Sequence, residues 1–249
     1  HTICYSVKAN SNLTILSLLA SLGSGFDIVS AGELSRVIKA GGDPQKTVFS
    51  GVGKTQEEIR YALNSDILCF NIESEDELYT INEIAIDMNT KANISVRVNP
   101  AISVDTHPYI TTGMKDNKFG IEQSQILPIY KEASKLPGIN IMGIDFHIGS
   151  QIMDINPYIE SLNKILEIID QLESDGIVLK HIDIGGGLGI SYQNESTVSK
   201  DTFVTEIINA IGERNLSIIV EPGRSIVGES GLLVSKVTNI KKTPFKNFA

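Results

Sequence analysis

Apolar residues along this chain follow two alternating patterns. Short runs, nearly continuous and rich in β-branched residues, alternate with longer runs in which apolar residues recur every three or four positions. The first pattern is typical of buried strands, and the second is typical of helices with one buried face. The short runs predict eight strands, over residues 2–9, 25–30, 46–51, 67–72, 93–100, 141–150, 181–187 and 217–223.

The longer runs predict a helix in each interval between these strands. They cover residues 12–23, 31–42, 55–65, 73–89, 122–136, 156–176 and 200–215. Strict alternation of strands and helices implies parallel strands joined by right-handed crossovers. We therefore predict an α/β fold of the (β/α)₈ TIM-barrel type, with an open doubly wound sheet as the alternative.

Two segments depart from the alternation. Residues 101–120, "AISVDTHPYITTGMKDNKFG", form a connection far longer than most strand-to-helix loops. We expect it to lie over an active site. After Gly228 the pattern changes to a simple alternation, so we predict a barrel over residues 1–230 and the first strand of a truncated all-β domain over 231–249.

The composition excludes some classes of binding partner. The chain has 249 residues, of which 41% are hydrophobic, and its net charge of -9 argues against a nucleic-acid-binding surface. No apolar run is long enough to predict a membrane span, and no secretory signal pattern opens the chain. Cys4 and Cys69 stand inside apolar runs without a Cys/His cluster, which favours free buried thiols, no metal site and a cytoplasmic location.

Chemically unusual residues stand at the ends of the predicted strands. They are Lys8, Asp27, Ser50, Asn71, Glu73, Arg97, His147, Gly185, Gly186, Gly187, Glu221 and Arg224. Catalytic groups of (β/α)₈ barrels lie at the carboxyl ends of the strands. We therefore expect these residues to surround one site.

Lys8 is the most informative of them. It forms either an ion pair at the rim or a desolvated amine with a lowered pKa, which is a nucleophile towards carbonyl compounds. The aldehyde of pyridoxal phosphate is the obvious acceptor. That cofactor also needs a phosphate cradle, a charged partner for its ring nitrogen and a group over its ring.

Later strand ends offer all three. The glycines at 185–187 form either a phosphate cradle or a plain tight turn. Glu221 is a candidate for the ring nitrogen, although it could instead pair with Arg224. His147 could lie on the ring face or be an ordinary buried histidine.

Together these segments resemble a known family. "YSVKAN", "GFDIVSAGEL", "VFSGVGKT", "RVNP", "HIGSQ", "DIGGGLGI" and "EPGR" are similar to the barrel-type (fold type III, alanine-racemase-like) pyridoxal-phosphate decarboxylases. "HIGSQ", "GGGLGI" and "THPYITTG…KFGI" are more typical of the diaminopimelate decarboxylase family than of its ornithine-type relatives.

The resemblance implies a role for each site residue. Lys8 would anchor the cofactor covalently and handle protons, and His147 would stack on the ring. Glu221 would pair with the ring nitrogen, and Asp27 and Arg97 would organise the surroundings. The remaining assignments concern anions. The phosphate would bind Ser150, the backbone of Gly185, Gly186 and Gly187, and the amides around Pro222 and Gly223. Arg224 would contact the distal carboxylate of the substrate as well as the cofactor.

The implied reaction is decarboxylation of the D-configured centre of meso-2,6-diaminopimelate to L-lysine and CO₂, the last step of lysine biosynthesis. Alternatives are a decarboxylase of ornithine, arginine or carboxynorspermidine, and a non-catalytic pyridoxal-phosphate-binding homologue. Family members form homodimers with shared active sites and carry a C-terminal β domain and a catalytic cysteine that these 249 residues lack. We therefore expect the chain alone to bind cofactor weakly and to be poorly active.

Overall fold

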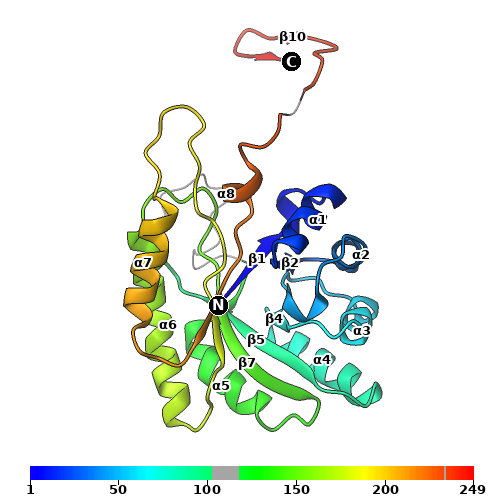
Figure 1. Ribbon diagram of the computed structural model, residues 1–249, viewed down its shortest axis with the longest axis vertical. Helices are drawn as coiled ribbons and strands as arrows, with labels where there is room; N and C mark the ends of the chain where they lie inside the picture. The colour runs from blue at the N-terminus through cyan, green and yellow to red at the C-terminus, as the bar shows by residue number, and fades with distance from the viewer. Residues whose placement is uncertain (103–117, 233) are drawn as a thin grey trace.

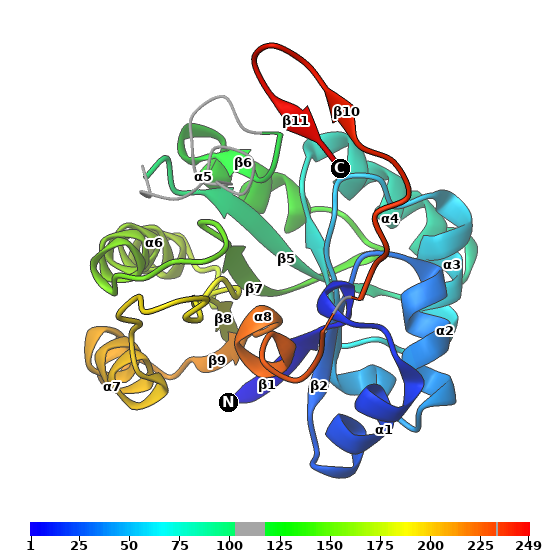
Figure 2. The same ribbon diagram turned by 90° about the horizontal axis from the view of Figure 1, so that it is seen from above.

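Eight parallel strands close into a ring in the computed structural model, which describes residues 1–102, 118–232 and 234–249 (Figure 2). The ring follows the order of the chain, and the pairing of β4 with β5 completes it. Its strands are β1 Thr2–Ser6, β2 Gly25–Ile28, β3 Thr47–Phe49, β4 Cys69–Ile72, β5 Ala92–Asn99, β7 Ile139–Phe146, β8 His181–Asp183 and β9 Ser217–Val220. The predicted barrel is confirmed.

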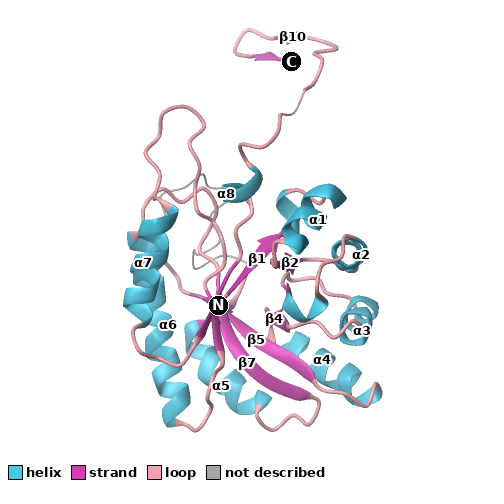
Figure 3. Cartoon of the chain, viewed as in Figure 1, coloured by secondary structure: helices cyan, strands magenta, loops and turns pink. Residues whose placement is uncertain are grey.

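Helices surround the ring (Figure 3). The seven predicted helices are present as α1 Leu13–Ser21, α2 Ala31–Lys39, α3 Gln56–Asn64, α4 Glu75–Asp87, α5 Gln123–Ala133, α6 Asn156–Ser174 and α7 Lys200–Ile211. Several begin at a residue whose side chain accepts a backbone N–H, and at α3 Thr55 and Glu58 form a capping box. These caps explain why the helices start where the apolar periodicity starts.

Four further elements were not predicted. They are the one-turn helix α8 Arg224–Val227, the two-residue strand β6 Ile121–Glu122 beside β5, and the 3₁₀ turns Val7–Ala9 and Pro44–Lys46. The first of these turns corrects the sequence analysis, because β1 ends at Ser6 and Lys8 lies in the turn that follows it.

The apolar core lies mainly between the ring and its helices. A second, smaller cluster of Cys4, Val48, Cys69 and Ile219 also packs together, and both cysteines are buried free thiols, as predicted. Buried polar side chains gather instead towards the carboxyl ends of the strands, among them Asp27, Arg97 and Asp183. The fold therefore concentrates its buried charge at one end of the barrel.

Residues beyond the barrel form little regular structure. The chain leaves α8 and ends in a small hairpin of β10 Lys241–Lys242 and β11 Asn247–Phe248, which stands away from the barrel (Figure 1). The assignment of 231–249 to a second domain stays a prediction. The segment "THPYITTG", with His107, lies outside the described residues. No helix within the described ranges is both long and apolar enough to cross a bilayer.

Candidate active site

A cavity of about 430 Å³ opens where the strands end. Its wall includes seven of the predicted site residues: Lys8, His147, Ser150, Gly187, Glu221, Gly223 and Arg224. The other predicted residues are not part of this wall: Asp27, Ser50, Asn71, Glu73, Arg97, Gly185, Gly186 and Pro222. Segments that are more than 200 residues apart in the chain thus meet in one place, as the strand-end pattern predicted.

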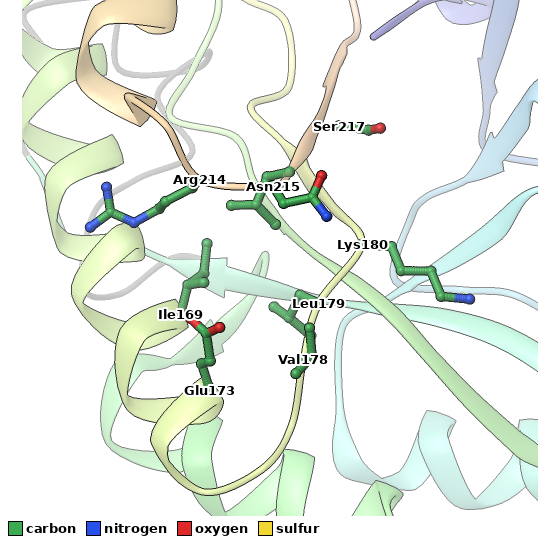
Figure 4. A pocket seen from close by; sticks show the side chains of 9 residues that line it. Ile169, Glu173, Val178, Leu179, Lys180, Arg214, Asn215 and Ser217 are labelled. Carbon is green, nitrogen blue, oxygen red and sulfur yellow. The ribbon is translucent and has the colours of Figure 1, made fainter.

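A second hollow of similar volume, about 420 Å³, lies at the opposite end of the barrel. Figure 4 shows its lining, which comes from α6 and from the segments that lead into β8 and β9. The side chain of Arg214 there forms an ion pair with Asp170 at 2.8 Å. Because none of the predicted site residues lines this hollow, the chemistry belongs to the first cavity.

Lys8 points its amine at Asp27. The two form an ion pair in which the Asp27 side chain is fully buried and half of the Lys8 side-chain surface is exposed. Burial lowers the pKa of Lys8, but the negative charges of Asp27 and Glu221 outweigh it, and the net pKa is raised. Of the two alternatives given for Lys8, the structure contains the ion pair; the lowered pKa of the other alternative is wrong, because a carboxylate is in direct contact with the amine.

Ser6 ties this pair to the neighbouring strand. Its hydroxyl donates to Asp27 Oδ2 at 2.7 Å and lies 3.1 Å from the backbone oxygen of Glu221. Its backbone N–H donates to the carbonyl of Pro222 at 3.1 Å. The ends of β1, β2 and β9 are therefore held in a fixed relation around Lys8.

Glu221 follows directly after β9, with its backbone N–H donating to the carbonyl of Gly185 at 2.8 Å. The residue is 6% exposed, and its Oε1 has no hydrogen-bond partner. Burial, and after it the charge of Asp183, raises the pKa of Glu221 well above its usual range. No ion pair among the described residues joins it to Arg224, so the alternative of a plain Glu221–Arg224 pair is not what the structure contains.

Arg224 instead faces Ser150. One guanidinium nitrogen donates to Ser150 Oγ at 3.3 Å, a second donates to the hydroxyl of Tyr192, and Nε is buried without a partner. The guanidinium also lies over the Tyr192 ring, 5.7 Å from its centroid. A cation and a hydroxyl directed to one part of a cavity wall form a suitable place for an anion.

His147 follows β7 and is held by the glycine run. Its Nδ1 accepts the backbone N–H of Gly186 at 3.2 Å. Burial and the nearby charges of Arg97 and Lys8 lower its pKa well below the usual range. The imidazole is therefore neutral, with a ring available to the cavity.

The glycine run is required by packing. A Cβ on Gly186 would lie 2.0 Å from the carbonyl oxygen of Glu221, and one on Gly187 would lie 2.2 Å from that of Gly149. The N–H of Gly185 donates to Asp183 Oδ1, and that of Gly186 donates to His147. Both amides therefore donate within the protein, and only Gly187 of the three forms part of the cavity wall.

Arg97 lies in β5 and is not part of the cavity wall. It contacts Glu73 Oε1 at 2.7 Å and lies 3.7 Å from Asp145 Oδ2, with all three side chains nearly inaccessible. Glu73 also accepts the backbone N–H groups of Gly51 and Gly120. This network joins the segment after β3 and the segment before β6 to β5.

Comparison with known proteins gives the family. The family model described as "Pyridoxal-dependent decarboxylase, pyridoxal binding domain" matches residues 1–228. The chain belongs to this family. Its members are thus relatives that share the barrel and its cofactor, pyridoxal phosphate.

Several of these decarboxylases are close relatives. Diaminopimelate decarboxylase from Vibrio cholerae is 50% identical over 250 residues, which cover 100% of this chain and 60% of that protein. A crystal structure of diaminopimelate decarboxylase from Helicobacter pylori complexed with L-lysine is 49% identical with a TM-score of 0.92, and covers 99% of this chain and 62% of that one. The lysine/ornithine decarboxylase from Vibrio vulnificus complexed with putrescine is more distant, at 26% identity and a TM-score of 0.76 over 90% of this chain and 57% of that one. The chain spans about 60% of the length of the curated relatives it matches.

The cavity fits the cofactor of this decarboxylase family. An amine, a neutral imidazole, an unpartnered buried carboxylate oxygen and a cation beside a hydroxyl all border the same space, at Lys8, His147, Glu221 and Arg224 with Ser150. These are the groups that an aldehyde, an aromatic ring, a ring nitrogen and a phosphate require. The donor set is therefore complete for pyridoxal phosphate.

Sequence reasoning missed four residues of the site. Asp145 and Asp183 are buried carboxylates, each two positions before a predicted residue, His147 and Gly185 respectively. The period of two along a strand was the signal that could have placed them inside the barrel. The same signal was present for Ser6, two positions before Lys8, whereas Tyr192 gave none, because loop tyrosines are common on any surface.

Proposed function

We propose that this chain is the cofactor-binding barrel of a diaminopimelate decarboxylase, which converts meso-2,6-diaminopimelate to L-lysine and CO₂. The single observation that carries a decarboxylase is the shared cavity of Lys8 and the unpartnered Glu221 carboxylate. The choice of diaminopimelate rests on relatives of that name at about 50% identity, against 26% for the lysine/ornithine enzyme.

Lys8 is the residue that would bind the cofactor covalently. The raised pKa keeps its amine protonated, so a proton must leave Nζ before that nitrogen can form a covalent bond. Asp27 Oδ2 is in contact with Nζ and is the acceptor for this proton. Ser6 keeps the carboxylate in place through its 2.7 Å hydrogen bond.

Pyridoxal phosphate, when bound, supplies a ring that accepts the electron pair left behind as CO₂ departs. Glu221 supports this by placing a negative charge where a protonated ring nitrogen would lie. The neutral imidazole of His147 covers the ring without adding a positive charge. The proton taken up by Asp27 can pass back to Lys8 Nζ through the same contact, and Lys8 would then be the donor of a proton to the carbon that lost CO₂.

Ser150, Gly187 and Arg224 form the anion-binding part of the wall. The contact between Arg224 and Ser150 favours a shared anion, the phosphate, for both residues. A contact of Arg224 with the distal carboxylate of the substrate stays a prediction, as do the phosphate contacts of Gly185, Gly186, Pro222 and Gly223.

We also propose a homodimer with shared active sites and a cytoplasmic location. The location is supported by the two buried cysteines, which are free thiols. The dimer is supported only by the resemblance to the family.

The test is turnover by the full-length protein on meso-diaminopimelate, ornithine, arginine and carboxynorspermidine. We expect kcat/KM to be highest for meso-diaminopimelate, with L-lysine as product, and we expect Lys8→Ala to abolish it. Lys39→Ala, an exposed lysine in α2, is the matched control and should retain activity. A preference for one of the other three substrates would replace the proposed substrate, and cofactor binding without any turnover would favour the non-catalytic alternative.

A further inference from the structure

Three carboxylates meet inside the barrel on adjacent strands. Asp145 lies in β7, Asp183 lies beside it in β8, and Glu221 follows β9. One oxygen from each lies within 4.8 Å of the others, and the residues are 1%, 0% and 6% exposed. Like charges this close in a buried place oppose each other's ionisation.

The cations near this cluster pair with other carboxylates. Lys8 contacts Asp27, and Arg97 lies closer to Glu73, at 2.7 Å, than to Asp145, at 3.7 Å. Among the residues that the structure describes, no ion pair reaches Asp183 or Glu221. Within the described part of the chain, these two carboxylates therefore have no positive charge in contact to offset them.

Each of the two also has an oxygen without a donor. Asp183 Oδ1 accepts the N–H of Gly185 at 2.9 Å, but Oδ2 has no partner, and neither has Glu221 Oε1. An ionised carboxylate can only accept hydrogen bonds, so one proton between the two groups would give both a partner. Glu221 borders the cavity, whereas Asp183 is not part of its wall.

The remaining groups around the pair do not change this picture. Asp27 in β2 and Asp145 in β7 add negative charge, and the thiols of Cys4 in β1 and Cys69 in β4 are neutral because burial raises their pKa values well above the usual range. Asn71 in β4 is uncharged, and its amide nitrogen donates to Ser50 at 3.1 Å. Burial raises the pKa of Asp183 to about 6; the Gly185 N–H and the side chains of Glu221 and Asn71 oppose this shift, and the charge of Asp27 adds to it.

We propose that Asp183 and Glu221 hold one proton between them and act as a single anionic partner for the ring nitrogen, with Asp183 as a positioning residue. When a protonated ring nitrogen faces Glu221, the shared proton moves to Asp183. Glu221 is then charged without a second charge beside it, and it receives a hydrogen bond from Asp183. The interaction with the ring nitrogen rests on the proposed function, whereas the proton shared by Asp183 and Glu221 does not.

The test is infrared spectroscopy of the full-length protein, freed of cofactor, in the region of the C=O stretch of protonated carboxyl groups. We expect a band that is lost in Asp183→Asn, in Glu221→Gln and in the double variant, since all three remove the same shared proton. Asp145→Asn is the matched control from the same cluster; burial raises the pKa of Asp145 as well, so this variant removes only a band of Asp145 itself and should keep the band that the other variants lose. Persistence of the band in either single variant, or its loss in Asp145→Asn, overturns the proposal.

Cofactor affinity gives a second readout. Asp183→Leu removes the donor to Glu221 and should weaken binding of pyridoxal phosphate by about ten- to a hundredfold, the range for one charge-assisted hydrogen bond. Asp183→Asn keeps an N–H donor and should restore most of this affinity, whereas equal losses in both variants contradict a positioning role. If Asp183 variants fail to fold, Glu221→Gln alone still tests the band. Absence of cofactor binding in the wild type would refute the proposed function and leave the shared proton standing.

Discussion

The substitution Gly187→Ala, compared with Gly41→Ala, separates the cost of a steric clash beside the cavity from the cost of a strained backbone. Gly187 has φ +98°, and a Cβ there would lie 2.2 Å from the Gly149 carbonyl oxygen and 3.0 Å from the Tyr158 hydroxyl. Gly41 is a matched control, because it has φ +84° and nothing within 4 Å of its Cβ position. A positive φ costs a residue with a side chain about 1–2 kcal/mol, and forcing an extra methyl into a packed place costs about 1–3 kcal/mol more.

The expected loss of unfolding free energy is therefore about 2–5 kcal/mol for Gly187→Ala and about 1–2 kcal/mol for Gly41→Ala. At this chain size, each kcal/mol corresponds to about 2–4 °C in Tm. Thermal unfolding followed by circular dichroism measures the difference between the two variants in the same background. The clash also acts on the segment after β7, so Gly187→Ala alone should weaken cofactor binding. Equal melting temperatures for the two variants would refute the close contact between Gly187 and Gly149.

Two further predictions concern buried charge. Arg97→Met leaves the buried Glu73 carboxylate without its cation and should cost about 3–5 kcal/mol in urea unfolding, whereas Arg60→Met at the exposed pair with Asp87 should cost less than about 1 kcal/mol. Burial lowers the pKa of His181 from 6.5 to about 4. As the pH falls, the histidine of the unfolded chain therefore takes up a proton before that of the folded chain does. Stability is lost from about pH 6.5 down to about pH 4. His181→Gln removes this loss, so its destabilisation relative to wild type should shrink by about 2 kcal/mol between pH 7 and pH 5. An unchanged difference across this range would mean that His181 titrates normally.

Most of the fold could be predicted from the sequence, because the local pattern of apolar residues agrees with the overall architecture. All eight barrel strands and all seven long helices lie where the spacing of apolar residues predicted them. The rule that functional residues of a barrel lie at the carboxyl ends of its strands then correctly predicted that residues as distant as Lys8 and Glu221 border one cavity. What pattern alone missed were short elements, such as the 3₁₀ turn that holds Lys8 and the four-residue helix that begins at Arg224.

The details of the site depend on contacts that a linear pattern does not contain. The pKa of Lys8 is raised because Asp27 touches its amine, and only the pairing of β1 with β2 brings the two together. The amides of Gly185 and Gly186 donate to Asp183 and His147, which residue type alone does not reveal. Tyr192 reaches Arg224 from a loop that has no regular structure to predict.

The most direct test of the central claim is to locate the cofactor on the protein. Full-length protein is loaded with pyridoxal phosphate, reduced with borohydride to fix any cofactor bound to a lysine, digested and analysed by mass spectrometry. We expect the pyridoxyl group on the peptide that contains Lys8, and its absence in Lys8→Ala. A pyridoxyl group on another lysine, such as the buried Lys54 beside Glu77, or on none, would contradict the account.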